Sequence, residues 1–246
     1  MKVKGSVALV TGANGGIGRA LVQELLKRGA AKIYLGARDP ASLRELVAES
    51  SKLVPVTLDV TNPKQIEEAA KTASDITLLI NNAGTVAFSG ALAAKDPMAA
   101  RQEMEVNYFG VLALTQALSG TPAFSNGGAV VNILSFLALA TLPVAGTYSA
   151  SKSAALALTR TLRAELKRRG VQVVGVLPVQ TDTPAYSPLP EPKLQPEEVA
   201  VGTLDGLEAG EEDVYPGAPS RAAAQVFKND PAALQARMST IVHAID

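Results

Sequence analysis

Residues 7–18 read VALVTGANGGIG, a short apolar run that ends directly in a glycine-rich turn. The run Val7–Thr11 is mostly apolar and partly β-branched, which predicts a strand covered on both faces of a sheet. The turn leads into Gly16–Arg28, a stretch of helical character. Glycines let the backbone approach a pyrophosphate, and the free N–H groups of a helix N-terminus stabilise its charge. This order predicts a dinucleotide-binding site, although such a turn also serves simply to join a strand to a helix.

The same alternation of strand and helix continues along the chain. Further strands are predicted at Lys32–Gly36, Val54–Leu58, Thr77–Asn81, Ala129–Leu134 and Gln172–Val176. Further helices are predicted at Ala41–Ser50, Pro63–Ala73, Met98–Leu118 and Tyr148–Arg169. This alternation predicts an α/β fold, a single-domain doubly wound parallel sheet of the Rossmann type with helices on both faces. Ligands of such sheets bind at the carboxyl ends of the strands.

No linker or internal repeat divides residues 1–246, so we expect a single domain that both binds the dinucleotide and carries the catalysis. The proline-rich stretch 184–196 is expected to form a loop over the substrate, or else an ordinary surface loop. Residues 218–246 are expected to form a helical C-terminal tail, with helices at Ala222–Phe227 and from Pro231 to about Ala244.

The composition excludes several classes of protein. Lys plus Arg equals Asp plus Glu at 23 each, so no global charge recruits nucleic acid or acidic membranes. There is no cysteine, which excludes disulfides, thiol catalysis and cysteine-ligated zinc, and we expect no metal site. The single histidine is His243, near the end of the chain, so proton transfer is expected from Tyr, Lys or a carboxylate. The apolar runs are too short or too interrupted for a signal peptide or membrane span, and we expect a cytoplasmic protein.

Further motifs follow the glycine-rich turn in a fixed order. They are Asn81-Asn82-Ala83-Gly84 after the fourth predicted strand, Asn107 in the next helix, Ser135 after the fifth strand, and Tyr148-Ser149-Ala150-Ser151-Lys152. Together these motifs resemble the short-chain dehydrogenase/reductase family, over about residues 5–183.

The glycines fit two branches of that family. Gly12, Gly16 and Gly18 have the spacing of the compact single-domain branch. Gly12, Gly15 and Gly18 have the spacing of the extended, epimerase-like branch. The extended branch adds a substrate domain for which 246 residues leave no room, so the length favours the compact branch.

Tyr148 and Lys152 are four residues apart and therefore share one face of the predicted helix. A free phenol has a pKa of about 10, and a fixed ammonium nearby favours the phenolate. Protonated Tyr148 would deliver a proton to a carbonyl oxygen as hydride reaches the carbon. The resemblance implies the remaining roles. Lys152 also holds the nicotinamide ribose, Ser135 hydrogen-bonds the reacting oxygen, and Asn107 orders a water that links the lysine to solvent.

The cofactor is predicted from the end of the second strand. NAD-specific proteins place an acidic residue there, whereas this chain has Ala37 and then Arg38. The Arg38 guanidinium would bind a 2′-phosphate in bidentate fashion, so we expect NADPH and NADP⁺ rather than NADH and NAD⁺. By resemblance, the cofactor-binding residues are Gly12, Asn14, Gly16, Ile17, Gly18, Arg38, Asp59, Val60, Asn81, Ala83, Gly84, Tyr148, Lys152, Pro178, Val179, Thr181 and Thr183.

The expected reaction is the reversible, NADPH-dependent reduction of a ketone or aldehyde to an alcohol. The expected walls of the substrate pocket are mostly apolar, which favours a small hydrophobic carbonyl or alcohol. They are Val86, Phe88, Phe136, Leu137, Leu142, Val179 and Tyr186. The resemblance also implies a homo-oligomer, with a dimer favoured, formed through the helices that contain Asn107 and Tyr148.

Alternative functions remain open at this stage. A non-catalytic NADP(H) sensor or scaffold would need the glycine-rich turn but not Ser135, Tyr148 and Lys152, which are all present. An NAD-dependent alcohol dehydrogenase would use the same catalytic residues. An enoyl reductase is less favoured, because the relatives with that activity space the tyrosine and lysine further apart.

Overall fold

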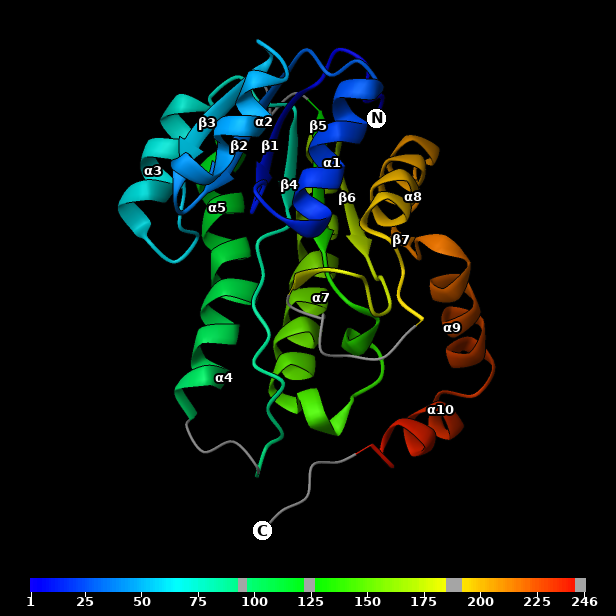
Figure 1. Cartoon of the computed structure of the whole chain (residues 1–246). Coiled ribbons are helices and arrows are strands. Elements are labelled where there is room, and N and C mark those ends of the chain that lie inside the picture. Colours follow the sequence, from blue (N-terminus) through cyan, green and yellow to red (C-terminus); the bar gives the residue numbers. More distant parts are fainter. Residues whose placement is uncertain (93–96, 122–126, 185–191, 242–246) are drawn as a thin grey trace.

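The apolar runs form one parallel sheet in the computed structural model, which describes residues 1–92, 97–121, 127–184 and 192–241. The strands are β1 (Val7–Thr11), β2 (Lys32–Ala37), β3 (Leu53–Thr57), β4 (Leu78–Asn81), β5 (Gly128–Ile133), β6 (Val171–Val176) and β7 (Asp213–Val214). Their order in the sheet is β3-β2-β1-β4-β5-β6-β7 (Figure 1). The order reverses between β1 and β4, and ligands of doubly wound sheets bind at such a switch point.

Helices cover both faces of the sheet (Figure 1). The α-helices are α1 (Gly16–Lys27), α2 (Arg44–Ala48), α3 (Pro63–Thr72), α4 (Pro97–Met104), α5 (Gly110–Ser119), α7 (Gly146–Leu166), α8 (Pro196–Ala209), α9 (Gly217–Asn229) and α10 (Pro231–Met238). The 3-10 turns are η1 (Pro40–Leu43), η3 (Phe136–Ala138), η4 (Pro143–Ala145) and η5 (Lys167–Arg169), and η2 (Glu105–Phe109) is a π-helix.

Successive residues of β1 belong to different cores. Ala8 and Val10 pack on the face covered by α1, α2 and α8, and Leu9 packs on the face covered by α3, α5 and α7. The sheet is therefore buried on both sides, which explains why its strands are apolar at almost every position. The α/β fold with a Rossmann-type parallel sheet is confirmed.

Two predicted helices are interrupted. The stretch Met98–Leu118 is not one helix, because a π-helical turn at Glu105–Phe109 separates α4 from α5. The stretch Ala41–Ser50 begins with a 3-10 turn rather than an α-helix. Asp39 caps that turn by accepting a hydrogen bond from Ala41 N, and Pro40 occupies its first position. Such local turn chemistry competes with regular helix and is invisible to hydrophobic periodicity.

The sheet has one strand more than the sequence predicts. β7 spans only Asp213 and Val214, too short for an apolar pattern to stand out. The preceding helix α8 was also not predicted. It begins with a capping box, in which the side chains of Gln195 and Glu198 each accept a hydrogen bond from the backbone N–H of the other. Within the described residues, no helix is long and apolar enough to cross a membrane.

Candidate active site

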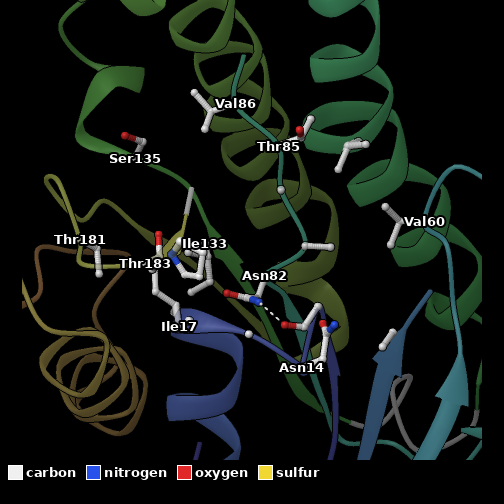
Figure 2. Close-up of a pocket in the computed structure, with 18 of the residues that line it drawn as sticks. Asn14, Ile17, Val60, Asn82, Thr85, Val86, Ile133, Ser135, Thr181 and Thr183 are labelled. Carbon is white, nitrogen blue, oxygen red and sulfur yellow. Dashed lines mark hydrogen bonds between the residues drawn. The ribbon is translucent and has the colours of Figure 1, made fainter. Parts of the chain in front are cut away.

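A cavity of about 870 Å³ lies at the carboxyl ends of the strands, beside the point where the strand order reverses. That volume is within the usual range for small-molecule and cofactor sites. Figure 2 shows side chains from the glycine-rich turn, from the segment after β4 and from the segment after β5 around the same space. The lining residues that the sequence predicts are Gly12, Asn14, Gly16, Ile17, Arg38, Asp59, Val60, Ala83, Gly84, Val86, Ser135, Tyr148, Lys152, Pro178, Val179, Thr181 and Thr183.

The glycines of the turn differ in how far they are constrained. Gly12 and Gly16 have φ angles of +63° and +43°, where other residues are strained. A Cβ atom on Gly18 would lie 2.1 Å from the carbonyl oxygen of Gly12, so Gly18 allows α1 to pack against the turn. Gly18 does not itself line the cavity. A Cβ on Gly15 would meet nothing within 4 Å. The sterically required glycines therefore have the compact spacing of 12, 16 and 18.

The segment after β4 holds the turn in place. Thr11 Oγ1 accepts hydrogen bonds from the backbone N–H groups of Asn82 and Ala83, both at 2.9 Å. The Asn82 amide nitrogen donates to the carbonyl oxygens of Thr11 at 2.9 Å and Gly12 at 3.2 Å. These bonds fix the backbone of Gly12 at the floor of the cavity. Neither Thr11 nor Asn82 was among the predicted site residues, although both belong to the motifs that the sequence presents.

Asn81 does not line the cavity, contrary to the expectation from sequence. Its amide nitrogen donates to Asn132 Oδ1 at 2.9 Å and to Thr115 Oγ1 at 3.3 Å, inside the core. Asn81 is the last residue of β4 and its side chain is turned into the core, whereas Asn82 follows the strand. Asn81 thus joins β4 to β5 and α5, and Asn82 takes the place at the cavity.

The N-terminus of α1 is suited to phosphate. Its N-cap residue Gly15 offers no side-chain cap, and its first turn contains no acidic residue. Its first N–H groups and its positive dipole end therefore lie at the cavity without a competing side-chain charge. Thr183 lies over this end, beside Ile17 (Figure 2), and a Cβ on Gly16 would come within 2.8 Å of Thr183 Cγ2. The glycine-rich turn thus fits a pyrophosphate held between α1 and the segment after Pro178.

Arg38 lies at the cavity beyond the end of β2, and its exposed guanidinium has no ion-pair partner in the described part of the chain. The neighbouring carboxylate of Asp39 is turned to Ala41 N at 2.9 Å. Ser42 also lines the cavity and was not predicted. Its Oγ accepts from Asn14 Nδ2 at 3.1 Å, so Ser42 ties the loop of Arg38 to the glycine-rich turn. This corner fits a phosphate on the adenosine ribose.

Lys152 is buried on α7, with 5% of its surface exposed, and its Nζ donates to the carbonyl oxygen of Ile133 at 2.9 Å. Desolvation by burial lowers the pKa of Lys152 from 10.5 to about 8. Nζ lies 5.7 Å from the ring centroid of Tyr148. A Cβ on Gly84 would come within 3.5 Å of Nζ. The ammonium is therefore fixed between β5, Gly84 and the tyrosine ring, at the edge of the cavity.

Ser135 and Tyr148 both line the cavity and come from different elements. Tyr148 lies in the first turn of α7 and is 6% exposed. Ser135 follows β5 and caps the 3-10 turn η3, where its Oγ accepts from Leu137 N at 3.2 Å. That bond uses a lone pair and leaves the hydroxyl hydrogen available to a substrate oxygen. Hydroxyl, phenol and ammonium thus belong to residues that line one cavity.

Asn107 lies behind the cavity rather than on its surface. Its Oδ1 accepts from Thr85 N, and its Nδ2 donates to Thr85 O and to Ser151 Oγ, each at 2.9 Å. Asn107 belongs to the π-helix η2, and such turns recur at functional sites. Its side chain joins η2, the segment after β4 and α7. The water that the family resemblance implies at this residue stays a prediction.

The substrate end of the cavity differs in part from the expected walls. Val86 and Val179 line it, whereas Phe88, Phe136, Leu137 and Leu142 do not. Phe136 packs instead against Phe227, with ring centroids 6.4 Å apart at 86°. Tyr186 lies outside the described residues, as do most of the proline-rich stretch and His243. Further lining residues that were not predicted are Gly15, Ala37, Asp39, Leu58, Thr85, Gln102, Val106, Ile133, Leu134 and Pro184.

Comparison with known proteins identifies the family of this chain. The sequence profile of the short chain dehydrogenase family matches residues 6–193. An uncharacterised oxidoreductase of Staphylococcus aureus is 32% identical over 212 residues, which cover 82% of this chain and 90% of that protein. A crystal structure of a short-chain dehydrogenase from Burkholderia cenocepacia J2315, in complex with NADP, is 46% identical, with a TM-score of 0.91 and coverage of 97% of this chain and 99% of that one.

A second similar structure is the bulky-bulky ketone specific alcohol dehydrogenase from Comamonas testosteroni. It is 27% identical, with a TM-score of 0.78, and the match covers 98% of this chain and 96% of that one. The glycine-rich turn, the serine, the tyrosine and the lysine thus occur in a chain whose sequence and fold both match one family. The chain belongs to the short-chain dehydrogenase/reductase family of oxidoreductases.

Proposed function

We propose that the protein reduces ketones or aldehydes to alcohols with NADPH, in a reversible reaction in which Tyr148 donates the proton. The observation that carries this proposal is that Ser135, Tyr148 and Lys152 line the same cavity as the glycine-rich turn. A sensor or scaffold would not require a buried ammonium beside a buried phenol.

NADP(H) is the cofactor, in agreement with the NADP complex of the Burkholderia cenocepacia relative. The turn of Gly12 and Gly16, the N-terminus of α1 and Thr183 would hold its pyrophosphate. Arg38 would hold the 2′-phosphate, for which its unpaired guanidinium is a suitable ligand. Bound NADPH would supply the hydride to the carbonyl carbon.

The side chains of this chain supply the proton and stabilise charge. Ser135 donates its hydroxyl hydrogen to the substrate oxygen and so holds the carbonyl in place. Tyr148 transfers its phenolic proton to the same oxygen as negative charge develops there. The phenolate that remains is stabilised by the ammonium of Lys152, fixed by the Ile133 carbonyl oxygen. Because this end of the site is largely buried, those charges interact more strongly than in water.

The proposed substrate class follows from the side chains that line the cavity. The predicted wall residues that line the cavity, Val86 and Val179, are apolar, and no Lys or Arg other than Lys152 and Arg38 lines the cavity within the described residues. A hydrophobic ketone or aldehyde fits such walls better than a keto acid. The Comamonas testosteroni relative, specific for bulky-bulky ketones, supports the same class.

The family resemblance also supports a homodimer formed through α4, α5 and α7. Phe109, at the end of the π-helix between α4 and α5, is 46% exposed. Light scattering of the protein and of a Phe109→Glu variant would test this arrangement, since a charge in the centre of an apolar interface should give a monomer.

The decisive experiment is Tyr148→Phe. This change keeps the ring and its packing but removes the transferable proton. We expect NADPH affinity and folding to be unchanged, and turnover of a ketone to fall by at least ~10²–10⁴-fold. Tyr215→Phe is the matched control, because Tyr215 is partly buried but does not line the cavity. Near-normal turnover by a folded Tyr148→Phe protein would rule out the mechanism.

A further inference from the structure

The residues expected to act on the substrate come from two elements. Tyr148 and Lys152 lie on helix α7, whereas Ser135 follows strand β5. The position of α7 along β5 therefore decides whether the Ser135 hydroxyl and the Tyr148 phenol reach one substrate oxygen. Much of the buried face of α7 is apolar and includes Ala155 and Leu158. Apolar packing is non-directional, so it does not by itself fix a helix at one position along a strand.

Two directional contacts join α7 to β5. Within the described residues, these are the only hydrogen bonds between the two elements. Lys152 Nζ donates to the carbonyl oxygen of Ile133 at 2.9 Å. Asn132 Nδ2 donates to Thr159 Oγ1, also at 2.9 Å. Thr159 follows Lys152 by about two helical turns, so both side chains lie on the face of α7 that meets the strand. The second bond thus fixes α7 at a point away from the cavity.

The bond between Asn132 and Thr159 belongs to a buried polar network. Asn132 is 1% exposed and Thr159 is fully buried. Thr159 Oγ1 donates to Ala155 O at 2.7 Å. Asn132 Oδ1 accepts from Asn81 Nδ2 at 2.9 Å, and Asn81 also donates to Thr115 Oγ1 in α5. A shift of α7 along β5 would separate Thr159 from the Asn132 amide and leave a buried donor unpaired, which is costly. The network therefore favours a single position of α7 on the strand.

We propose that Asn132 and Thr159 are positioning residues, whose bond holds α7 where the Tyr148 phenol meets the same substrate oxygen as the Ser135 hydroxyl. This proposal rests on the proposed function, because it concerns the alignment of groups for that reaction. Toward the start of α7 the chain leads from Thr159 to Lys152 and Tyr148, and toward the end of β5 it leads from Asn132 to Ser135. A displacement at the bond is therefore passed along both elements to the reacting groups.

The test compares Thr159→Val with Thr203→Val. Both threonines are fully buried, and each hydroxyl donates at 2.7 Å to the carbonyl oxygen four residues earlier in its own helix. Among the described residues, only Thr159 also accepts a bond from another element. For Thr159→Val we expect kcat to fall about 10- to 100-fold, because a small misplacement of reacting groups has effects of this order. KM for the ketone should be largely unchanged, and Thr203→Val should keep the kcat of the unmodified enzyme.

Thr159→Ser provides the rescue. It keeps the hydroxyl that accepts from Asn132 and loses only a buried methyl group, so its stability should fall while its kcat stays close to that of the unmodified enzyme. A merely structural role of Thr159 would leave kcat unchanged in every folded variant. Unchanged kcat in Thr159→Val would overturn the proposal. So would an equal loss of kcat in Thr159→Ser or in Thr203→Val.

A double variant covers the case in which Thr159→Val does not fold. Asn132→Leu combined with Thr159→Val removes both partners, so no unpaired amide remains at this contact and the protein should be more stable than Thr159→Val alone. Because the directional bond is still missing, its kcat should be as low as that expected for Thr159→Val. A double variant with the kcat of the unmodified enzyme would overturn the proposal.

Crystal structures of the variants separate this proposal from the proposed function. If the unmodified enzyme reduces no ketone, the proposed function fails, but the position of α7 can still be measured. The distance from Lys152 Nζ to Ile133 O, 2.9 Å in the unmodified protein, should exceed hydrogen-bond reach in Thr159→Val or in the double variant. It should be retained in Thr203→Val. An unchanged distance in Thr159→Val and in the double variant would show that the bond does not position the helix, and would overturn the proposal.

Discussion

Glu103 lies four residues before Asn107, and the two side chains accept hydrogen bonds from one extended segment of backbone. Asn107 Oδ1 accepts from Thr85 N at 2.9 Å, and Glu103 Oε1 accepts from Ala87 N at 2.8 Å. Val86, the residue between Thr85 and Ala87, lines the cavity. Glu103 is 1% exposed, and its second oxygen has no hydrogen-bond partner among the residues that the structure describes. The protein thus buries an incompletely paired carboxylate to fix one wall of its site.

Substitutions of Glu103 should separate its role as a hydrogen-bond acceptor from the cost of burying its carboxylate. Glu103→Gln keeps an acceptor for Ala87 N and replaces the carboxylate by a neutral amide, which costs less to bury. We expect the free energy of unfolding to rise by about 1 kcal/mol, with KM for a ketone unchanged. Glu103→Ala leaves Ala87 N without its partner, so stability should fall below that of Glu103→Gln and KM should rise. Denaturant unfolding measures the stability of each variant, and steady-state kinetics measures its KM. Equal stability of the two variants would contradict the role of Glu103 as the acceptor for Ala87 N.

Lys152 should make stability depend on pH. Burial lowers its pKa in the folded protein to about 8, from 10.5, which corresponds to roughly 3 kcal/mol of unfavourable charge burial. Between these two pH values the unfolded chain binds more protons than the folded one, so the stability contributed by this residue rises with pH. Lys152→Met should therefore be more stable than the unmodified protein near neutral pH, by roughly 1–3 kcal/mol. That advantage should shrink as the pH rises through this window.

Urea unfolding of the unmodified protein and of Lys152→Met, from neutral pH to above pH 10.5, measures this dependence. The same variant should have lost turnover and NADPH affinity, so the gain in stability and the loss of function would coincide. A stability difference that does not vary with pH would show that burial does not lower the pKa of Lys152 in the folded protein.

Arg38 should set the preference between cofactors. Its guanidinium would form a charge-assisted bond to a 2′-phosphate, a contribution of roughly 1.5–3 kcal/mol. We expect NADPH to bind more tightly than NADH, and Arg38→Asp to remove or invert that preference. Fluorescence titration with both cofactors measures it. Arg44→Asp is the control, because Arg44 is an exposed arginine nearby that does not line the cavity. Tighter binding of NADH by the unmodified enzyme would contradict the role of Arg38.

The apolar substrate end should discriminate against charge. We expect higher kcat/KM for aryl or alkyl ketones than for keto acids of similar size, because a carboxylate would be desolvated beside Val86 and Val179 without a cation to pair with it. A panel of matched ketones and keto acids measures this ratio. A preference for keto acids would require a cation that contacts the substrate, and would mean that the substrate end is wrongly placed.

The fold could be predicted where local pattern and final environment agree. The core strands are apolar on both faces because the sheet is covered on both faces, and their bounds differ from the predicted ones by one residue or so at an end. The pattern fails where a turn decides the structure. Asp39 starts a 3-10 turn after β2, and the π-helix at Glu105–Phe109 lies inside an otherwise regular apolar period.

The site could be predicted where its residues belong to one sequence motif. Tyr148 and Lys152 share a helix, so their spacing alone places them together. Ser42 lines the cavity, where its hydroxyl accepts a hydrogen bond from Asn14, 28 residues away. Gln235 and Thr141 are 94 residues apart, and no local pattern indicates that they meet. Contacts of this kind depend on how the whole chain packs, which a single sequence does not display.

Gly15 differs from its neighbours in the glycine-rich turn. It lines the cavity, its φ angle of −146° is open to any residue, and a side chain there would meet nothing within 4 Å. A substitution at Gly12, Gly16 or Gly18 would strain the backbone or collide with it, whereas position 15 has room for a long side chain. An arginine introduced there would place a second cation at the cofactor. For protein engineering, position 15 is therefore where this turn can gain selectivity for the phosphorylated cofactor without a steric penalty.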